Sequence, residues 1–201
     1  QEKEWEKFQR VYAGNSEQKL FFRLVSEIDK KGTINIMRNG FKESGCEFKL
    51  FYPKPNNNKN PDLFEKFGKN IFSVVDELRY EKDKGDKDSN KLDLVIFING
   101  LPIITIELKD TFSQGVENAI EQYKKDRDPR EPIFQKCLVH FAMSDEKVFM
   151  ATKLDGWKTR FLPFNKGLEN PEVKNDYKTS YLYNDVLQIN KLSKLIDKFI
   201  Y

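Results

Sequence analysis

Three residues near the centre of the chain could together carry out hydrolytic chemistry. Asp93 lies inside the apolar stretch 92–98, and the stretch 103–108 leads into Glu107 and Lys109 in the pattern E-x-K. Carboxylate oxygens are the hard ligands that Mg²⁺ prefers, and a bound ion lowers the pKa of a coordinated water and neutralises developing charge. A lysine beside them can orient the attacking water or stabilise the transition state. This set of residues therefore fits metal-assisted phosphodiester hydrolysis.

The pattern Asp-x13-Glu-x-Lys also has an ordinary explanation. Charged residues make up 33% of the chain, so the three residues could simply mark the ends of strands. An acid inside a strand as apolar as the one around Asp93 is nevertheless costly to bury unless a cation or hydrogen bonds compensate it. The spacing alone favours the ordinary explanation, and the hairpin context raises the chemical explanation above chance.

The two apolar stretches are separated by Asn99-Gly100-Leu101-Pro102, which predicts a β-hairpin because Gly100 can supply a positive φ. Paired residues across a hairpin have a constant index sum, so Asp93 and Glu107 share a face only if that sum is even. We predict an odd-length loop, with a type I turn closed by Gly100 as a bulge, since a two-residue Asn-Gly loop would place the acids on opposite faces. Asp93, Glu107 and Lys109 would then line one face. The other face would hold Leu94, Ile96, Ile104, Ile106 and Leu108.

The remaining patterns predict the elements that must position this hairpin. Apolar residues at helical spacing indicate two N-terminal helices, one around Trp5, Phe8 and Tyr12 and one that ends before Gly32. Downstream we expect a strand within 71–80, a charged loop at 81–90, a helix at 116–125, and strands at 137–142 and 148–151 around a polar turn. This order indicates an α/β sandwich with a mixed sheet.

Composition narrows the class of protein. Thirty-five Lys and Arg against 32 Asp and Glu give a net charge of only +3, so any affinity for nucleic acid must come from local patches. Cys46 and Cys137 form no C-x-x-C pair, which fits a reducing compartment and argues against a structural zinc site. No apolar run is long enough to span a bilayer and no signal peptide is visible, so we expect a soluble cytoplasmic protein without membrane contact.

The ends of the chain suggest a fragment. The sequence starts without Met and stops within an apolar helical face formed by Ile189, Leu192, Ile196 and Phe199. We expect that face to pack against a segment that followed in a longer polypeptide.

The sequence segments around the three residues identify a family more specifically than the spacing of the residues does. "LDLVIFINGLPIITIELKD" (92–110) resembles the nuclease motif of the restriction (R) subunit of type I restriction-modification enzymes, a branch of the PD-(D/E)XK nucleases in which an Asp, "FINGLP" and E-x-K form one β-hairpin. Further segments agree in the same order: "VENAIEQYKKDRDPREPIF" (116–134), "LVHFAMSDEKVFMATKL" (138–154), "FLPFNKG" (161–167) and "NDYKTSYL" (175–182). The resemblance covers most of the chain and implies a PD-(D/E)XK nuclease-like mixed β-sheet flanked by helices.

The resemblance also implies roles for individual residues. Asp93 and Glu107 would be ligands of Mg²⁺, and Lys109 would be the catalytic lysine. Many members carry a Q-x-x-x-Y motif on the following helix, which implies a role for Gln122. Here the fourth position after Gln122 is Asp126, so the tyrosine is missing or displaced, with Tyr123 as a substitute.

Other candidates are weaker. A further acid from an early helix is common in the superfamily, and Glu17 and Glu27 both stay open for it. His140 stands alone in an apolar strand, so we assign it no catalytic role. Basic residues after the predicted helix could contact DNA phosphates, although a solvated face explains them about as well. They are Lys124, Lys125, Arg127 and Arg130.

We therefore expect an endonuclease domain at 1–184 and, at 185–201, a helix leading toward an absent helicase-like motor domain. The resemblance implies double-stranded DNA as substrate, specificity and methyltransferase subunits as partners, and ATP only for the absent motor. The alternative is a noncatalytic DNA-binding or subunit-docking module that kept the fold and lost the activity. The intact Asp-Glu-Lys set favours the enzyme.

Overall fold

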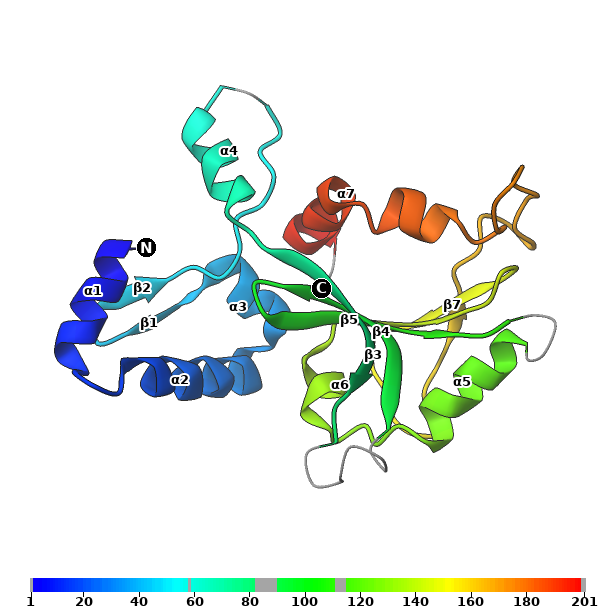
Figure 1. The fold of residues 1–201 in the computed structure, drawn as a ribbon, viewed down its shortest axis with the longest axis horizontal. Helices are drawn as coiled ribbons and strands as arrows, with labels where there is room; N and C mark the ends of the chain where they lie inside the picture. Colours follow the sequence, from blue (N-terminus) through cyan, green and yellow to red (C-terminus); the bar gives the residue numbers. More distant parts are fainter. Residues whose placement is uncertain (1, 58, 82–89, 111–114, 200–201) are drawn as a thin grey trace. The chain divides into compact units, whose positions relative to one another are not determined.

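A computed structural model describes residues 2–57, 59–81, 90–110 and 115–199 of the chain. The chain forms two compact units, one made of residues 1–70 and 193–201 and the other of residues 71–192 (Figure 1). Each unit is described by itself. This division does not test the boundary at residue 184, which stays a prediction.

The first unit is built from short helices around a small hairpin. The two predicted N-terminal helices are confirmed as α1 (Glu2–Val11) and α2 (Ser16–Lys31). Elements that we did not predict follow: α3 (Thr33–Asn39), β1 (Phe41–Glu43), β2 (Cys46–Phe48) and α4 (Pro61–Gly68). Phe8 of α1 packs edge-on against Phe48 of β2, which forms part of the core. Gly40 precedes β1 at φ +69°, where a Cβ would stand 2.1 Å from the carbonyl oxygen of Phe48, so only glycine fits.

The second unit contains a six-stranded mixed sheet. Its strands lie in chain order: β3 (Phe72–Arg79), β4 (Lys91–Ile98), β5 (Leu101–Leu108), β6 (Val139–Met143), β7 (Val148–Ala151) and β8 (Leu162–Pro163). All neighbouring pairs are antiparallel except β5 and β6, which are parallel. The chain crosses between those two strands through α5 (Val116–Lys125) and α6 (Pro132–Lys136) (Figure 1). The predicted fold class, a mixed sheet flanked by helices, is confirmed.

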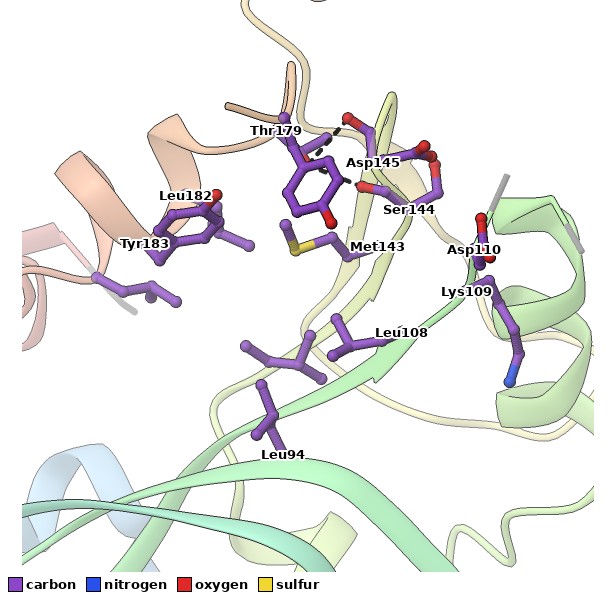
Figure 2. Close-up of a pocket in the computed structure, with 13 residues that line it drawn as sticks. Leu94, Leu108, Lys109, Asp110, Met143, Ser144, Asp145, Thr179, Leu182 and Tyr183 are labelled. Atoms are coloured by element: carbon purple, nitrogen blue, oxygen red, sulfur yellow. Dashed lines mark hydrogen bonds between the residues drawn. The ribbon is translucent and has the colours of Figure 1, made fainter. Parts of the chain in front are cut away.

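Different segments cover the two faces of this sheet. Helix α5 packs on β5, β6 and β7 and buries Val116, Ala119 and Tyr123 in the core. On the other face, residues 177–187, which include the π-helical turn η1 (Leu182–Val186), lie over Leu94, Ile106 and Leu108 (Figure 2). An apolar pocket of about 660 Å³ remains between them. The hairpin thus has a helix-covered face and a pocket face.

The register of the hairpin shows that the predicted loop length is wrong, although Asp93 and Glu107 share a face as predicted. The turn is a two-residue Asn99-Gly100 turn with φ of 50° and 81°, so the predicted odd-length loop is wrong. Ile96 pairs with Ile104 but Phe97 pairs with Pro102, which leaves Ile103 as an extra residue on β5. This β-bulge restores an even index sum below the turn. Asp93 and Glu107 therefore do share a face, through a bulge in the strand rather than an odd loop.

The other predicted elements of this unit are also present. The strand expected at 71–80 is β3, the helix at 116–125 is α5, and the strands at 137–142 and 148–151 are β6 and β7. The charged loop predicted at 81–90 lies largely outside the described residues. The C-terminal helix forms as α7 (Ile189–Lys194) and a π-helical turn, η2 (Leu195–Phe199). Within the described ranges, no helix is long and apolar enough to cross a membrane.

Candidate active site

Glu107 is the most constrained residue of the predicted set. It lies on β5 with 0% of its surface exposed. Its Oε1 atom accepts a hydrogen bond from Arg127 Nε at 2.8 Å and forms an ion pair with Arg127 Nη2 at 2.6 Å. Its Oε2 atom is buried and has no hydrogen-bond partner among the residues that the structure describes. One oxygen of this carboxylate is thus held in place, and the other is left for something else.

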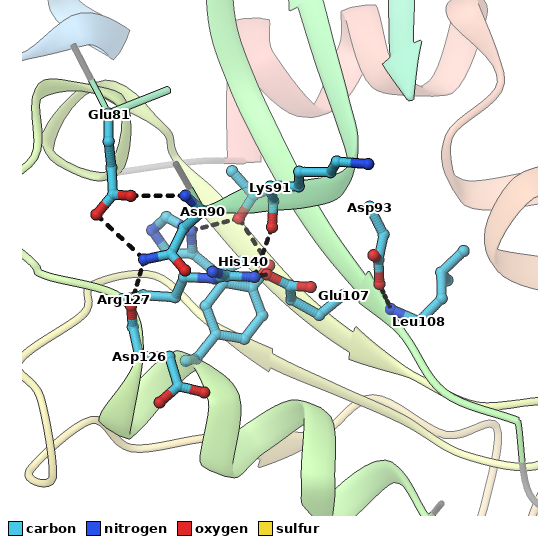
Figure 3. Close-up of polar contacts among 11 residues, drawn as sticks. Glu81, Asn90, Lys91, Asp93, Glu107, Leu108, Asp126, Arg127 and His140 are labelled. Atoms are coloured by element: carbon cyan, nitrogen blue, oxygen red, sulfur yellow. Dashed lines mark hydrogen bonds and ion pairs between the residues drawn. The ribbon is translucent and has the colours of Figure 1, made fainter. Parts of the chain in front are cut away.

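Arg127 comes from the segment after α5 and is itself only 3% exposed. Besides Glu107, its Nη2 atom donates to the carbonyl oxygen of Lys91 on β4 at 2.6 Å (Figure 3). Its guanidinium carbon stands 5.9 Å from the ring centroid of Tyr80. The predicted place of Arg127 on a DNA-binding surface is therefore wrong, because the side chain is buried in an ion pair. Sequence spacing gave no signal for this contact, which joins residues 20 positions apart across a helix.

Asp93 lies beside Glu107 at the end of the β4–β5 ladder. Continuing the register of Leu94 with Ile106 places Asp93 opposite Glu107. Asp93 Oδ2 accepts a hydrogen bond of 2.7 Å from the backbone N–H of Leu108 (Figure 3). The carboxylate thereby replaces a backbone carbonyl in the ladder, and its orientation is fixed by the strand that carries Glu107.

The surroundings of Glu107 disfavour its ionised form. The pKa of Glu107 is raised to about 7, mainly because the side chain is buried; the positive charge of Arg127 opposes this rise, and the negative charge of Asp93 contributes to it. Two carboxylates this close repel each other, and the single guanidinium is bonded to only one oxygen. A second positive charge at the free oxygens would relieve the repulsion.

Lys109 completes the set on the same face of β5. Its backbone N–H donates to the carbonyl oxygen of Met143 at 2.9 Å, so the parallel ladder with β6 continues past Leu108. Side chains alternate along a strand, which puts Lys109 on the face of Glu107. Figure 2 shows the Lys109 side chain extending away from the apolar residues of the pocket. The register pairs Asp93 with Glu107 on one face of the hairpin, and alternation along the strand predicts the same face for Lys109, which also borders the apolar pocket.

A buried polar chain lies beside Glu107 under helix α5. Thr105 Oγ1 is 2.8 Å from Tyr123 Oη and 2.7 Å from His140 Nδ1. Burial lowers the pKa of His140 to about 4, so the imidazole is neutral. Tyr123 is fully buried in this polar chain, whereas the neighbouring Gln122 is partly exposed. The alternation that pairs Asp93 with Glu107 also puts Thr105 on their face, so this residue could have been found from the sequence.

The other predicted DNA contacts lie at the surface. Lys124 is partly exposed at the end of α5. Lys125 pairs with Glu121, and its ammonium stands 5.2 Å from the ring centroid of Trp157. Arg130 is 87% exposed and pairs with Asp128 at 2.8 Å. These residues remain accessible to a phosphate.

The early-helix acids belong to the first unit. Glu27 is buried and pairs with Arg23 at 2.8 Å and with Lys31 at 2.6 Å, and the lysine hydrogen bond is the main cause that lowers its pKa. Glu17 is exposed in the first turn of α2. The choice between them stays open.

The two carboxylates, Asp93 and Glu107, form a donor set that suits a magnesium ion. Mg²⁺ prefers carboxylate oxygens, is often bound by only one or two of them, and keeps several waters. Asp93 and Glu107 are two such ligands, and the buried, unpaired Oε2 of Glu107 is an acceptor that a cation would satisfy. Across the described ranges, no cluster of three or more His, Cys, Asp or Glu side chains could hold a metal. The residues present therefore fit a two-carboxylate Mg²⁺ site, and not a closed metal cage.

A comparison with known protein families shows which family this chain belongs to. Residues 4–159 match the family described as type I restriction enzyme R protein N terminus. The chain belongs to this family. The matched range includes the whole Asp93–Lys109 hairpin and helix α5.

A named relative agrees with the family. Over 91 residues, the chain is 34% identical to a protein of Methanocaldococcus jannaschii named as the endonuclease subunit of a type I restriction enzyme, MjaVIIIP. The aligned part is 44% of this chain and only 8% of that relative. No solved structure matches the chain.

Proposed function

We propose that this domain is the Mg²⁺-dependent endonuclease domain of a type I restriction R subunit, with a PD-(D/E)XK active site at Asp93, Glu107 and Lys109. One observation carries the proposal. The buried Glu107 keeps one oxygen unpaired beside a second carboxylate, whose orientation is fixed by the backbone of Leu108. Strand alternation puts Lys109 on the same face. A purely structural ion pair would have no need for the second acid or for the orphaned oxygen.

Each side chain has a separate task in this proposal. Asp93 and Glu107 would hold the ion, which lowers the pKa of a coordinated water and neutralises charge on the scissile phosphate. Lys109 would orient the attacking water and stabilise charge on the phosphate oxygens. The hydrogen bond from Leu108 N to Asp93 and the two contacts of Arg127 with Glu107 keep both carboxylates in fixed orientations. Gln122, one residue from the buried Tyr123, would help to position DNA on the exposed side of α5.

Family membership supports a proposal for the substrate and the partners. We propose double-stranded foreign DNA as substrate, with Lys124, Lys125 and Arg130 as phosphate contacts. The aligned part is only 8% of the M. jannaschii relative, so a full-length R subunit has room for ATP-dependent motor domains. The specificity and methyltransferase subunits would recognise the DNA sequence. The assembly would act in the cytoplasm, where its DNA substrate lies.

The test is a plasmid-cleavage assay with the complete restriction complex that contains this chain, with and without Mg²⁺. Asp93→Ala, Glu107→Ala and Lys109→Ala should each abolish cleavage, and combining them should add little because they act as one unit. ATP-driven translocation should continue in all three and serves as the control for assembly. Wild-type cleavage by these variants would favour the docking-module alternative.

A further inference from the structure

Arg127 makes contacts that a simple counter-ion would not need. Its hydrogen bond to Glu107 and its ion-pair contact with Glu107 both end on Oε1, and the buried Oε2 has no hydrogen-bond partner among the described residues. The Nη2 atom also holds the carbonyl oxygen of Lys91, two residues before Asp93 on the neighbouring strand. One guanidinium therefore ties the Glu107 side chain to the strand that carries the other carboxylate.

The planar shape of guanidinium makes this link rigid. Its N–H donors point in fixed directions, so holding Glu107 and the Lys91 carbonyl together restricts how the carboxylate can rotate. The face of Arg127 lies against Tyr80, and burial leaves the side chain little freedom to turn away. The free Oε2 of Glu107 is thus presented in one direction, on the face it shares with Asp93.

We infer that Arg127 is a positioning residue of the proposed nuclease site, which orients Glu107 so that its free oxygen and Asp93 can bind one divalent ion together. The inference rests on the proposed function. It assigns to Arg127 an indirect role in metal binding, and it removes this residue from the DNA-binding surface where the sequence had placed it. Residues that orient metal ligands typically change metal affinity about 10- to 100-fold when they are replaced.

The competing explanation predicts the opposite sign. If Arg127 only balances the charge of Glu107, then it competes with a metal ion for that carboxylate. Removing the guanidinium would then leave metal affinity unchanged or make binding tighter. If Arg127 positions Glu107, then removing it makes binding weaker.

The experiment measures Mn²⁺ binding by calorimetry to the full-length protein that contains this chain, without DNA or nucleotide. Mn²⁺ is the probe, and the signal of interest is the part that Asp93→Ala removes. Arg127→Met keeps most of the side-chain volume and should weaken that part about 10- to 100-fold. The matched control is Arg160→Met, which replaces an exposed arginine of the same unit and should bind Mn²⁺ like the wild type. Unchanged or tighter binding by Arg127→Met would overturn the inference.

Two further variants separate an effect on metal binding from a loss of folding, and test whether Arg127 acts through Glu107. Arg127→Lys keeps the charge but cannot reproduce the planar fork, so it should unfold near the wild-type temperature and still bind Mn²⁺ about tenfold more weakly. Wild-type affinity in this variant would contradict positioning. In a Glu107→Gln background, Arg127→Met should cause no further loss, since it acts through Glu107, and an undiminished effect there would also refute the inference. A wild-type protein with no Asp93-dependent Mn²⁺ binding would instead contradict the proposed function itself.

Discussion

The buried Glu107 should give the fold a distinctive dependence on pH, which Glu107→Gln removes. Burial raises the pKa of Glu107 to about 7 from an ordinary value of 4.5. Between these values the unfolded chain has released this proton while the folded chain still holds it. The unfolded state then binds fewer protons, so the stability that Glu107 contributes is complete below 4.5 and is lost as pH rises to about 7.

The size of the effect follows from the two pKa values. The interval from 4.5 to about 7, at about 1.4 kcal/mol for each pH unit, corresponds to about 3 kcal/mol in the free energy of unfolding. Glutamine has nearly the same shape and does not titrate, so the variant lacks this contribution at every pH. His140 titrates in the same range with the opposite sign, because its pKa is lowered to about 4, but both proteins share it.

The assay is urea unfolding of the wild-type chain and Glu107→Gln across this pH range, without divalent ions, followed by circular dichroism. Subtracting the two profiles cancels every group that they share. The wild type should lose about 3 kcal/mol relative to the variant as pH rises from 4.5 to 7. A difference that stays constant across the range would refute the assignment of a raised pKa to Glu107 and the electrostatic argument built on it.

Three further predictions concern single groups. Lys109→Arg should lower DNA cleavage by the complete complex at least about tenfold, because a planar fork cannot replace a compact ammonium beside two carboxylates, and activity within about threefold of wild type would show that charge suffices. Thr105→Val should lower the free energy of unfolding by about 1 to 3 kcal/mol by leaving Tyr123 and His140 without their partner, whereas Thr105→Ser keeps the hydroxyl; equal stability of the valine variant would contradict the buried chain. The 201-residue chain should bind DNA with a dissociation constant of about 10⁻⁴ to 10⁻⁶ M and strong salt dependence, since its net charge is +3, and a hundredfold preference between two unrelated duplexes in a salt titration would contradict nonspecific binding.

Local patterns predicted the parts of the fold that have long, regular signals. The eight-residue strands of the hairpin follow from two apolar runs on either side of a turn signal, and helix α5 follows from helical spacing. The elements missed in the first unit are short, such as β1 and β2 with three residues each, and so few residues show no measurable period. The bulge at Ile103 was missed because it depends on how two strands pair and not on the sequence of the turn.

Part of the candidate site could likewise be predicted from local sequence, and part could not. The shared face of Asp93 and Glu107 could be argued from parity, because that rule links residues through one hairpin. The role of Arg127 could not, since its contacts with Glu107 and Lys91 join three segments and depend on where α5 ends in space. Within a charged stretch, the sequence alone does not distinguish a basic residue that is buried in an ion pair from one that is exposed at the surface.

The most direct test of the central claim is the location of a divalent ion in a crystal of this protein soaked with Mn²⁺, which scatters X-rays anomalously. We predict one anomalous peak within ligand distance of both Asp93 and the free Oε2 of Glu107, with waters in the remaining positions and Lys109 facing them. The peak should be absent from crystals of Asp93→Ala prepared in the same way. A wild-type structure in which these carboxylates bind no ion at saturating Mn²⁺, or in which the ion binds elsewhere, would contradict the assignment of Asp93, Glu107 and Lys109 as a nuclease site.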